Sequence, residues 1–227
     1  MTVISTTTLL THDTIDGASP LSEAAVAAVH SFCDRAEDGD KDRPLVLRLS
    51  GAPAPGRSGR TSLRLVNRWE GALRRLERLR VATIAVVTGD CGGPALEALL
   101  TTDYRLAADG SRLVLSASGG VWPGMGLHRL ANQVGSGRAR RHLLLGEAIT
   151  ADRALQLGLV DELTADLPAR LASAVEQVSA LGGTALAVRR QLMLEAGATS
   201  FEEALGRHLA ACDRQLKQAA DEEDQSC

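Results

Sequence analysis

Apolar and polar residues alternate along this chain in two distinct rhythms, one typical of helices and one typical of strands. In residues 61–79, apolar side chains recur at three- and four-residue steps, with arginines on the remaining face. The apolar positions are Val66, Trp69, Leu73 and Leu76. This spacing predicts an amphipathic helix. The short apolar runs 45–49 and 81–87 predict buried strands on either side of it.

The amino-terminal segment predicts one more strand and one more helix. Val3 to Leu10 has the composition of a strand, and Asp13 to Gly17 has that of a turn. Ser19 precedes Pro20, which favours a helix start, and the Ala/Val-rich stretch that follows predicts a helix to about Glu37.

The second half of the chain is predicted to be mainly helical. Two short strands are expected at 104–107 and 112–115, followed by helices at about 127–134, 138–145 and 151–157. The segment GLVDEL at 158–163 is followed by further helices. Ser200 and Glu203 have the spacing of a capping box, which predicts the start of a last helix running toward Ala220.

Composition limits the classes of protein to which the chain could belong. With 227 residues, 44% of them hydrophobic, it is long enough for one compact domain with a sizeable core. A formal net charge of -3 gives no reason to expect nucleic acid or an anionic membrane as a partner. No apolar run approaches the ~18 to 20 residues that span a bilayer, and the amino terminus lacks the features of a signal peptide.

The four cysteines suggest neither a metal site nor a disulfide framework. Cys33, Cys91, Cys212 and Cys227 lie far apart, with no C-x-x-C spacing. A soluble protein of the reducing cytoplasm fits this pattern best. No ligand cluster or phosphate-binding fingerprint predicts a metal, flavin or nicotinamide cofactor.

The segment from Val81 to Asp103 carries the most specific signal. It predicts a buried strand, a glycine-rich turn, a short helix and an acidic cap. Gly89, Glu97 and Asp103 are separated by eight and six residues. This spacing resembles the pattern G-x-x-x-G-G-G-x-E, followed by C-D-x-R-I-A, of the enoyl-CoA hydratase (crotonase) superfamily.

Later motifs extend the resemblance over residues 45–163. Trp122-Pro-Gly-Met-Gly-Leu-His-Arg-Leu130 is similar to the family's P-x-x-G-G-x-x-R-L turn and helix, and Gly158-Leu-Val-Asp161 matches its G-L-V-D. The resemblance implies an α/β fold, a spiral of ββα units in residues 1–163. It also implies a helical carboxyl-terminal region in residues 164–227, of the kind that usually builds trimers or hexamers.

Within the superfamily, the chain resembles the small hydratase-like proteins of the dihydroxyphenylglycine pathway. The matching segments are CGGPALEALL, YRLA and WPGMGLHRL. This resemblance implies two protein partners, a type III polyketide synthase and a second crotonase-like protein. It also implies a coenzyme A thioester as ligand, and assembly as a homo-oligomer or hetero-complex.

The family's chemistry requires groups that this sequence retains only in part. Family hydratases use two carboxylates, with two backbone N–H groups that stabilise the thioester enolate. Glu97 matches the first carboxylate and is the candidate catalytic residue. The family's triplet falls on Gly93, Pro94 and Ala95, and proline has no N–H to donate. The second carboxylate falls on residues 116–117, and no glutamate occurs between Glu97 and Glu147.

The remaining candidates have both functional and structural interpretations. Gly92 and Gly93 are candidate oxyanion or acyl-CoA contacts, or glycines required for close packing. Trp122 is either a wall of the acyl pocket or a packing anchor. Glu97 either moves protons or holds a turn by hydrogen bonds. Residues 51–59 are only a loose match to the loop that supplies the second oxyanion donor.

Other residues with reactive or charged side chains favour structural roles. Cys91 has no neighbouring histidine in the sequence, and His128 is expected to be a surface or packing residue. The arginines of residues 57–80 form either a phosphate- or partner-binding stripe or a solvated helix face.

Two functions therefore remain open. The first is an accessory protein that assists the synthase in forming dihydroxyphenylacetyl-CoA on a degraded hydratase site. The second is an active lyase that dehydrates or aromatises a polyketonyl-CoA intermediate with Glu97 moving protons. An ordinary enoyl-CoA hydratase is a third idea, against which Pro94 argues.

Overall fold

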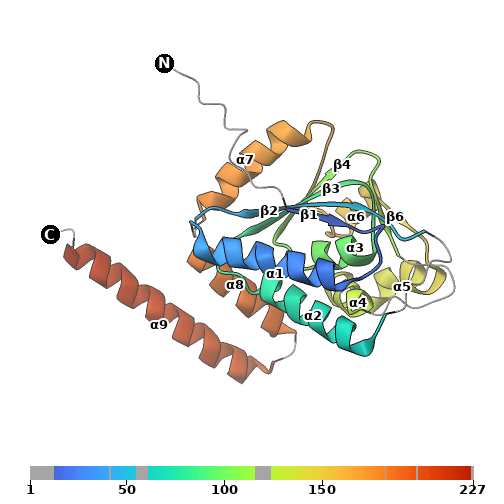
Figure 1. The fold of residues 1–227 in the computed structure, drawn as a ribbon. Coiled ribbons are helices and arrows are strands. Elements are labelled where there is room, and N and C mark those ends of the chain that lie inside the picture. Colours follow the sequence, from blue (N-terminus) through green and yellow to red (C-terminus); the bar gives the residue numbers. More distant parts are fainter. Residues whose placement is uncertain are drawn as a thin grey trace, which may run out of the picture.

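Strands and helices alternate along most of the chain in the computed structural model, which describes residues 13–40, 42–54, 61–115, 124–181, 183–197 and 199–225 (Figure 1). The first elements are β1 (Asp13–Asp16), α1 (Glu23–Asp38), β2 (Leu45–Gly51), α2 (Leu63–Glu77), β3 (Thr83–Gly92) and α3 (Gly93–Leu99). The middle elements are β4 (Tyr104–Ala108), β5 (Arg112–Val114), α4 (Gly126–Val134), α5 (Ser136–Leu145), β6 (Ile149–Thr150), α6 (Ala151–Gln156) and β7 (Glu162–Thr164). The last are α7 (Leu167–Ser179), α8 (Gly183–Ala196) and α9 (Phe201–Gln225).

The strands form one sheet whose main order, β1-β2-β3-β4-β7, is parallel throughout. β5 pairs in parallel with the distal end of β3 and antiparallel with β6. Parallel neighbours need crossover connections, and helices provide them here. The arrangement confirms the predicted α/β class with a helical carboxyl-terminal region.

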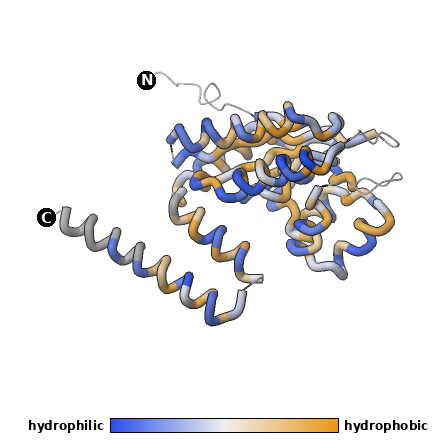
Figure 2. Tube along the Cα trace, turned by 60° about the horizontal axis from the view of Figure 1, so that its bottom comes forward, coloured by the Kyte–Doolittle hydropathy of each residue, from blue (hydrophilic) through white to orange (hydrophobic). Residues whose placement is uncertain are grey.

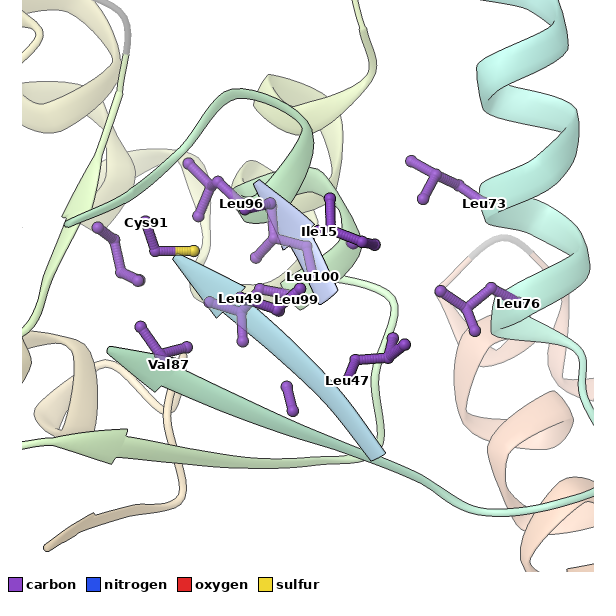
Figure 3. Packing of buried hydrophobic residues seen from close by; sticks show 14 of the residues in the cluster. Ile15, Leu47, Leu49, Leu73, Leu76, Val87, Cys91, Leu96, Leu99 and Leu100 are labelled. Carbon is purple, nitrogen blue, oxygen red and sulfur yellow. The ribbon is translucent and has the colours of Figure 1, made fainter. Parts of the chain in front are cut away.

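Helices α1, α2 and α3 cover one face of the sheet and α7 covers the other (Figure 1). Figure 3 shows Leu73 and Leu76 projecting from α2 toward Leu47 of β2. All three are fully buried, and burial of such a side chain is worth about 1.5 to 3 kcal/mol. The amphipathic helix predicted for residues 61–79 is confirmed.

The opposite face is covered by residues that follow position 163. Leu171, Ala174 and Val178 of α7 pack against the apolar side chains of the sheet. Those sheet residues are Val46, Ile84, Val86 and Leu106. The division of the chain at residue 163 stays a prediction, but α7 is a layer of the core.

The first strand lies at a different place from the one predicted. The stretch Val3 to Leu10 lies outside the described residues, whereas Asp13–Asp16, which was expected to be a turn, pairs in parallel with β2. Alternate residues Asp13 and Ile15 are buried and the other two are exposed. Strand pairing is made by backbone hydrogen bonds, so a segment of mainly polar residues can form this edge strand.

Two further helix boundaries depend on hydroxyl caps. The residue that caps the start of α1 is Ser22 rather than the predicted Ser19. Its hydroxyl accepts the N–H of Ala25 at 3.2 Å. The capping box of the last helix is confirmed, since Ser200 Oγ accepts the Glu203 N–H at 3.3 Å and the Glu203 carboxylate accepts the Ser200 N–H at 3.4 Å.

The last helix, α9, extends away from the sheet (Figure 1). In both views α9 projects from the body of the molecule beyond α8 (Figures 1 and 2). Arg190 anchors α8 to the body. Its Nε lies 2.9 Å from Asp103 Oδ1, and its other nitrogens donate to the carbonyls of Glu77 and Val81. No helix in the described part of the chain is long and apolar enough to cross a membrane.

Candidate active site

The glycine turn after the central strand is shorter than its composition predicts. β3 continues past Val87 to Gly92, because Asp90–Gly92 pairs with β5. Gly89 and Gly93 have positive φ angles of 63° and 50°, so both favour glycine. Gly92 precedes α3 in an extended conformation, and Pro94 lies in the first turn of that helix.

Three backbone segments approach one another closely at this turn. A Cβ at Gly92 would lie 2.8 Å from the Val114 carbonyl oxygen and 2.9 Å from Ala52 Cβ. A Cβ at Gly93 would lie 2.9 Å from the Gly17 carbonyl oxygen and 3.0 Å from Pro53 Cγ. Gly92 and Gly93 are therefore required for packing, and Ala52 and Pro53 occupy the space beside them.

This packing bears on how the turn could stabilise an oxyanion. The middle position of the family triplet is Pro94, which contributes no N–H. Pro53, in the loop after β2, lacks an N–H as well. The turn therefore has a proline at the middle triplet position and a second proline packed against Gly93.

Glu97 projects from α3 into the interior, where its carboxylate bridges two other helices. Its side chain is 1% exposed. Oε2 accepts the indole N–H of Trp69 on α2 at 2.6 Å, and Oε1 accepts the backbone N–H of Gly126 on α4 at 2.8 Å. The candidate catalytic carboxylate is thus held by a donor on each oxygen.

The segment before α4 lies directly on this carboxylate. A Cβ at Gly124 would overlap both oxygens of Glu97, and a Cβ at Gly126 would lie 3.2 Å from Oε1. The two glycines let the backbone contact the carboxylate, which explains their spacing in the sequence.

A second carboxylate holds the same helix end from α2. Glu70 Oε1 accepts the Met125 N–H at 2.9 Å, and Glu70 Oε2 lies 2.9 Å from a guanidinium nitrogen of Arg129. Sequence reasoning missed Glu70 and placed Trp69 only on the apolar face of its helix. One signal was available, because a fully buried indole N–H usually finds an acceptor.

The other predicted site residues either lie outside the described residues or have no contact with Glu97 among the interactions described above. Trp122 and the position of the second carboxylate, 116–117, lie outside the described residues. Cys91 is fully buried, and burial raises the pKa of its thiol, so a nucleophilic thiolate is disfavoured. His128 is exposed on α4, with its ring 2.9 Å from the Asn132 amide, as expected of a surface residue.

The arginine stripe partly fastens α2 to α1. Arg68 pairs with Glu23, while Arg75 lies 2.7 Å from Asp34 and 2.6 Å from Glu37. The other exposed arginines of this segment are Arg64, Arg74, Arg78 and Arg80, and Arg57 and Arg60 lie outside the described residues. Within residues 61–80, the stripe is in part structural and in part solvated.

Comparisons with known proteins agree with this geometry. The family model described as enoyl-CoA hydratase/isomerase matches residues 60–226. A protein of Amycolatopsis orientalis named enoyl-CoA-hydratase is 47% identical over 207 residues, which cover 91% of this chain and 95% of that protein.

Solved structures give the same result for the fold. An enoyl-CoA hydratase from Mycobacterium smegmatis superposes with a TM-score of 0.73 at 25% identity, covering 87% of this chain and 82% of that one. An enoyl-CoA hydratase/isomerase from Marinobacter aquaeolei gives a TM-score of 0.75 at 20% identity, covering 90% and 86%. With its parallel sheet, its turn after β3 and its buried glutamate, the chain belongs to the enoyl-CoA hydratase/isomerase (crotonase) superfamily.

Proposed function

We propose that this chain is a crotonase-fold accessory protein of the DpgB type, which assists a type III polyketide synthase in forming dihydroxyphenylacetyl-CoA and does not itself hydrate enoyl-CoA thioesters. The observation that carries the proposal is the turn after β3, where Pro94 removes the N–H of the middle triplet position and Ala52 and Pro53 pack against Gly92 and Gly93. The pathway itself rests on the resemblance of CGGPALEALL, YRLA and WPGMGLHRL.

The loss of turnover expected from the missing catalytic groups supports an accessory role. Loss of one oxyanion donor lowers turnover on the order of 10²- to 10³-fold in well-studied enzymes. The sequence also lacks a glutamate between Glu97 and Glu147, where the second carboxylate of a hydratase would fall. Two independent losses on one site argue against efficient hydration.

The proposal includes a ligand and partners. A coenzyme A thioester is the proposed ligand, contacting the backbone of Gly92 and Gly93 on the side away from Ala52 and Pro53, with Trp122 as a wall of the acyl pocket. The partners are the synthase and a second crotonase-like protein, in a homo-oligomer or hetero-complex in the cytoplasm. No resident metal or redox cofactor is part of the proposal.

Two assays on the same preparation test it. The first measures dihydroxyphenylacetyl-CoA made from malonyl-CoA by the synthase and the second crotonase-like protein, with and without this protein. The second measures hydration of crotonyl-CoA by the loss of enoyl absorbance. We expect a higher product yield and no hydration above buffer. An unchanged yield would overturn the pathway assignment, and rapid hydration would overturn the non-hydratase reading.

The alternative lyase is favoured by one observation, the retention of a buried glutamate at the family position next to the turn. In that case Glu97 takes a proton from the polyketonyl-CoA chain as water leaves, and aromatisation drives the step. This alternative predicts that the protein converts a polyketonyl-CoA intermediate after the synthase has been removed by filtration. The accessory role predicts no conversion without the synthase.

A further inference from the structure

The polar groups at the junction of α2, α3 and α4 have the chemistry of a helix cap. We infer that Trp69 and Glu70 are positioning residues which, together with Glu97, form a tertiary cap on the first turn of α4. The glutamate at the family's catalytic position then acts as part of a helix cap rather than as a proton carrier. This inference deepens the proposed function, although its structural half can be tested without the synthase.

The first argument is the need of α4 for acceptors. The first amides of a helix have no partner within the helix. Met125, at the start of α4, provides no side-chain cap. Instead, the consecutive N–H groups of Met125 and Gly126 donate to Glu70 and Glu97, at 2.9 and 2.8 Å. Carboxylates at this end also interact favourably with the helix dipole.

The second argument is the state of the Glu97 oxygens. Among the described residues, Oε2 accepts the indole N–H of Trp69 and Oε1 accepts the backbone N–H of Gly126. Both oxygens are therefore already engaged by the helices that surround them. The carboxylate is also 1% exposed and lies under the backbone of Gly124, so a ligand has no open approach through the described residues.

The third argument is that α2 supplies two consecutive residues to the same helix end. Trp69 is fully buried and reaches Glu97, while its neighbour Glu70 reaches Met125 and Arg129. Arg129 of α4 returns to α2, with one guanidinium nitrogen 2.9 Å from Glu70 and another 3.9 Å from Glu77. Side chains of α2 thus contact α4, and a side chain of α4 contacts α2. Such reciprocal contacts fix the position of one helix relative to the other.

Nuclear magnetic resonance tests the cap directly, because the chain has only two tryptophans, Trp69 and Trp122. A ¹H–¹⁵N spectrum has two indole N–H peaks, and Trp69→Phe identifies one by its loss. We expect Glu97→Gln to shift the Trp69 peak and the Gly126 amide, since a neutral amide oxygen is a weaker acceptor than a carboxylate. The matched control is Glu147→Gln, which removes an exposed charge paired with Arg141 and is expected to leave the Trp69 peak unchanged. An unmoved Trp69 peak in Glu97→Gln would overturn the cap.

The synthase assay then separates positioning from proton transfer. We expect Glu97→Gln and Glu70→Gln each to raise, several-fold, the protein concentration needed for half of the maximal yield, while the maximal yield stays near that of the wild type. A collapse of the maximal yield in Glu97→Gln alone would overturn the inference, because only a proton carrier predicts that difference.

Further variants and controls keep the outcome decisive. If Glu97→Gln does not fold, Trp69→Phe provides the same comparison with Glu70→Gln, because it removes the indole donor and leaves the carboxylate in place. If the wild type fails to raise the yield, the proposed function falls, and the spectra alone decide whether the cap exists.

Discussion

The junction of α2, α3 and α4 and the arm formed by α8 and α9 use their side chains in opposite ways. At the junction, Trp69 and Glu97 are 0% and 1% exposed, and their polar atoms are paired by donors and acceptors from three helices. On the arm, Met193 and Phe201 are 69% and 76% exposed. Leu205 and Leu209 continue the apolar stripe of α9 at four-residue steps.

The junction therefore buries and pairs its side chains within this chain, whereas the arm leaves large apolar side chains exposed. A buried carboxylate is tolerated only where it is hydrogen-bonded. At the junction, residues of this same chain provide those hydrogen bonds. Exposed large apolar side chains in a contiguous group are typical of contact surfaces. The arm therefore is the region on which the proposed homo-oligomer or hetero-complex would depend, and Arg190 is the point where it is fastened to the core.

Removal of Arg190 is expected to have the largest effect, because it breaks the link between the two regions. Burial raises the pKa of Asp103, and the nearby guanidinium of Arg190 opposes that rise. Arg190→Leu would remove the ion-pair partner of this buried carboxyl, at a cost of about 3 to 5 kcal/mol in the free energy of unfolding. Urea denaturation measures the change. The exposed neighbour provides the control, since Arg189→Leu is expected to change stability by less than ~0.5 kcal/mol.

Overpacking of the junction is expected to be the next largest effect. In Gly124→Ala, the new methyl group would overlap both oxygens of Glu97, and such insertions cost about 1 to 3 kcal/mol. Gly137→Ala on α5 is the matched control, because a Cβ there meets nothing within 4 Å and alanine favours helix. Equal stability of the two variants would mean that the backbone before α4 does not lie on the carboxylate.

The seam between the core and the residues after 163 is expected to respond to alkaline pH. Tyr104 on β4 donates to Glu162, and Arg170 of α7 donates to both. Burial, followed by the bond to Glu162, raises the pKa of Tyr104 to about 12.

The direction of this pH effect follows from the raised pKa. The unfolded chain ionises its tyrosine near pH ~10, so the stability contribution is complete below that pH and is lost as pH rises toward 12. The chain has a single tyrosine, so ultraviolet absorbance of the phenolate reports its titration directly. A midpoint near the ordinary value would show that the seam is open in solution.

The smallest effect on unfolding is expected on the arm itself. Phe201→Ser and Leu205→Ser alter exposed positions and should each change the unfolding free energy of a monomeric preparation by less than ~0.5 kcal/mol. Their effect should appear instead as a lower mass in sedimentation experiments at high concentration. A loss of ~2 kcal/mol or more in the unfolding free energy of the monomer would contradict the difference between junction and arm. It would mean that the arm packs on the core of its own chain.

The parts of this structure that sequence could predict are those fixed by local spacing. The offsets of Gly89, Glu97 and Asp103 identified the fold, and the Ser200–Glu203 capping box located α9. Each of these signals lies within a few turns of chain. His128, which was expected to be a surface or packing residue, is exposed.

The interactions that sequence missed join distant residues or depend on the backbone. Trp69 and Glu97 lie 28 positions apart, and nothing in their own neighbourhoods indicates that they meet. The pairing of Asp13–Asp16 with β2 is a property of an edge strand, whose polar composition is typical of turns. The close approach of Pro53 to Gly93 depends on how the segments after β2 and β3 pack together, which the local sequence of neither segment predicts.

The cover that α7 provides for the second face of the sheet has a consequence for synthesis on the ribosome. The strands β2, β3 and β4 emerge first, and their apolar face, with Val46, Ile84 and Leu106, waits for a helix that is completed only at Ser179. A nascent chain that pauses before that point would present this face to chaperones and to other nascent chains. A chain that terminates early within α9 would already have both faces covered. The order of translation thus leaves the surface most prone to aggregation uncovered longest, and makes α9 the segment that the core can lose and still fold.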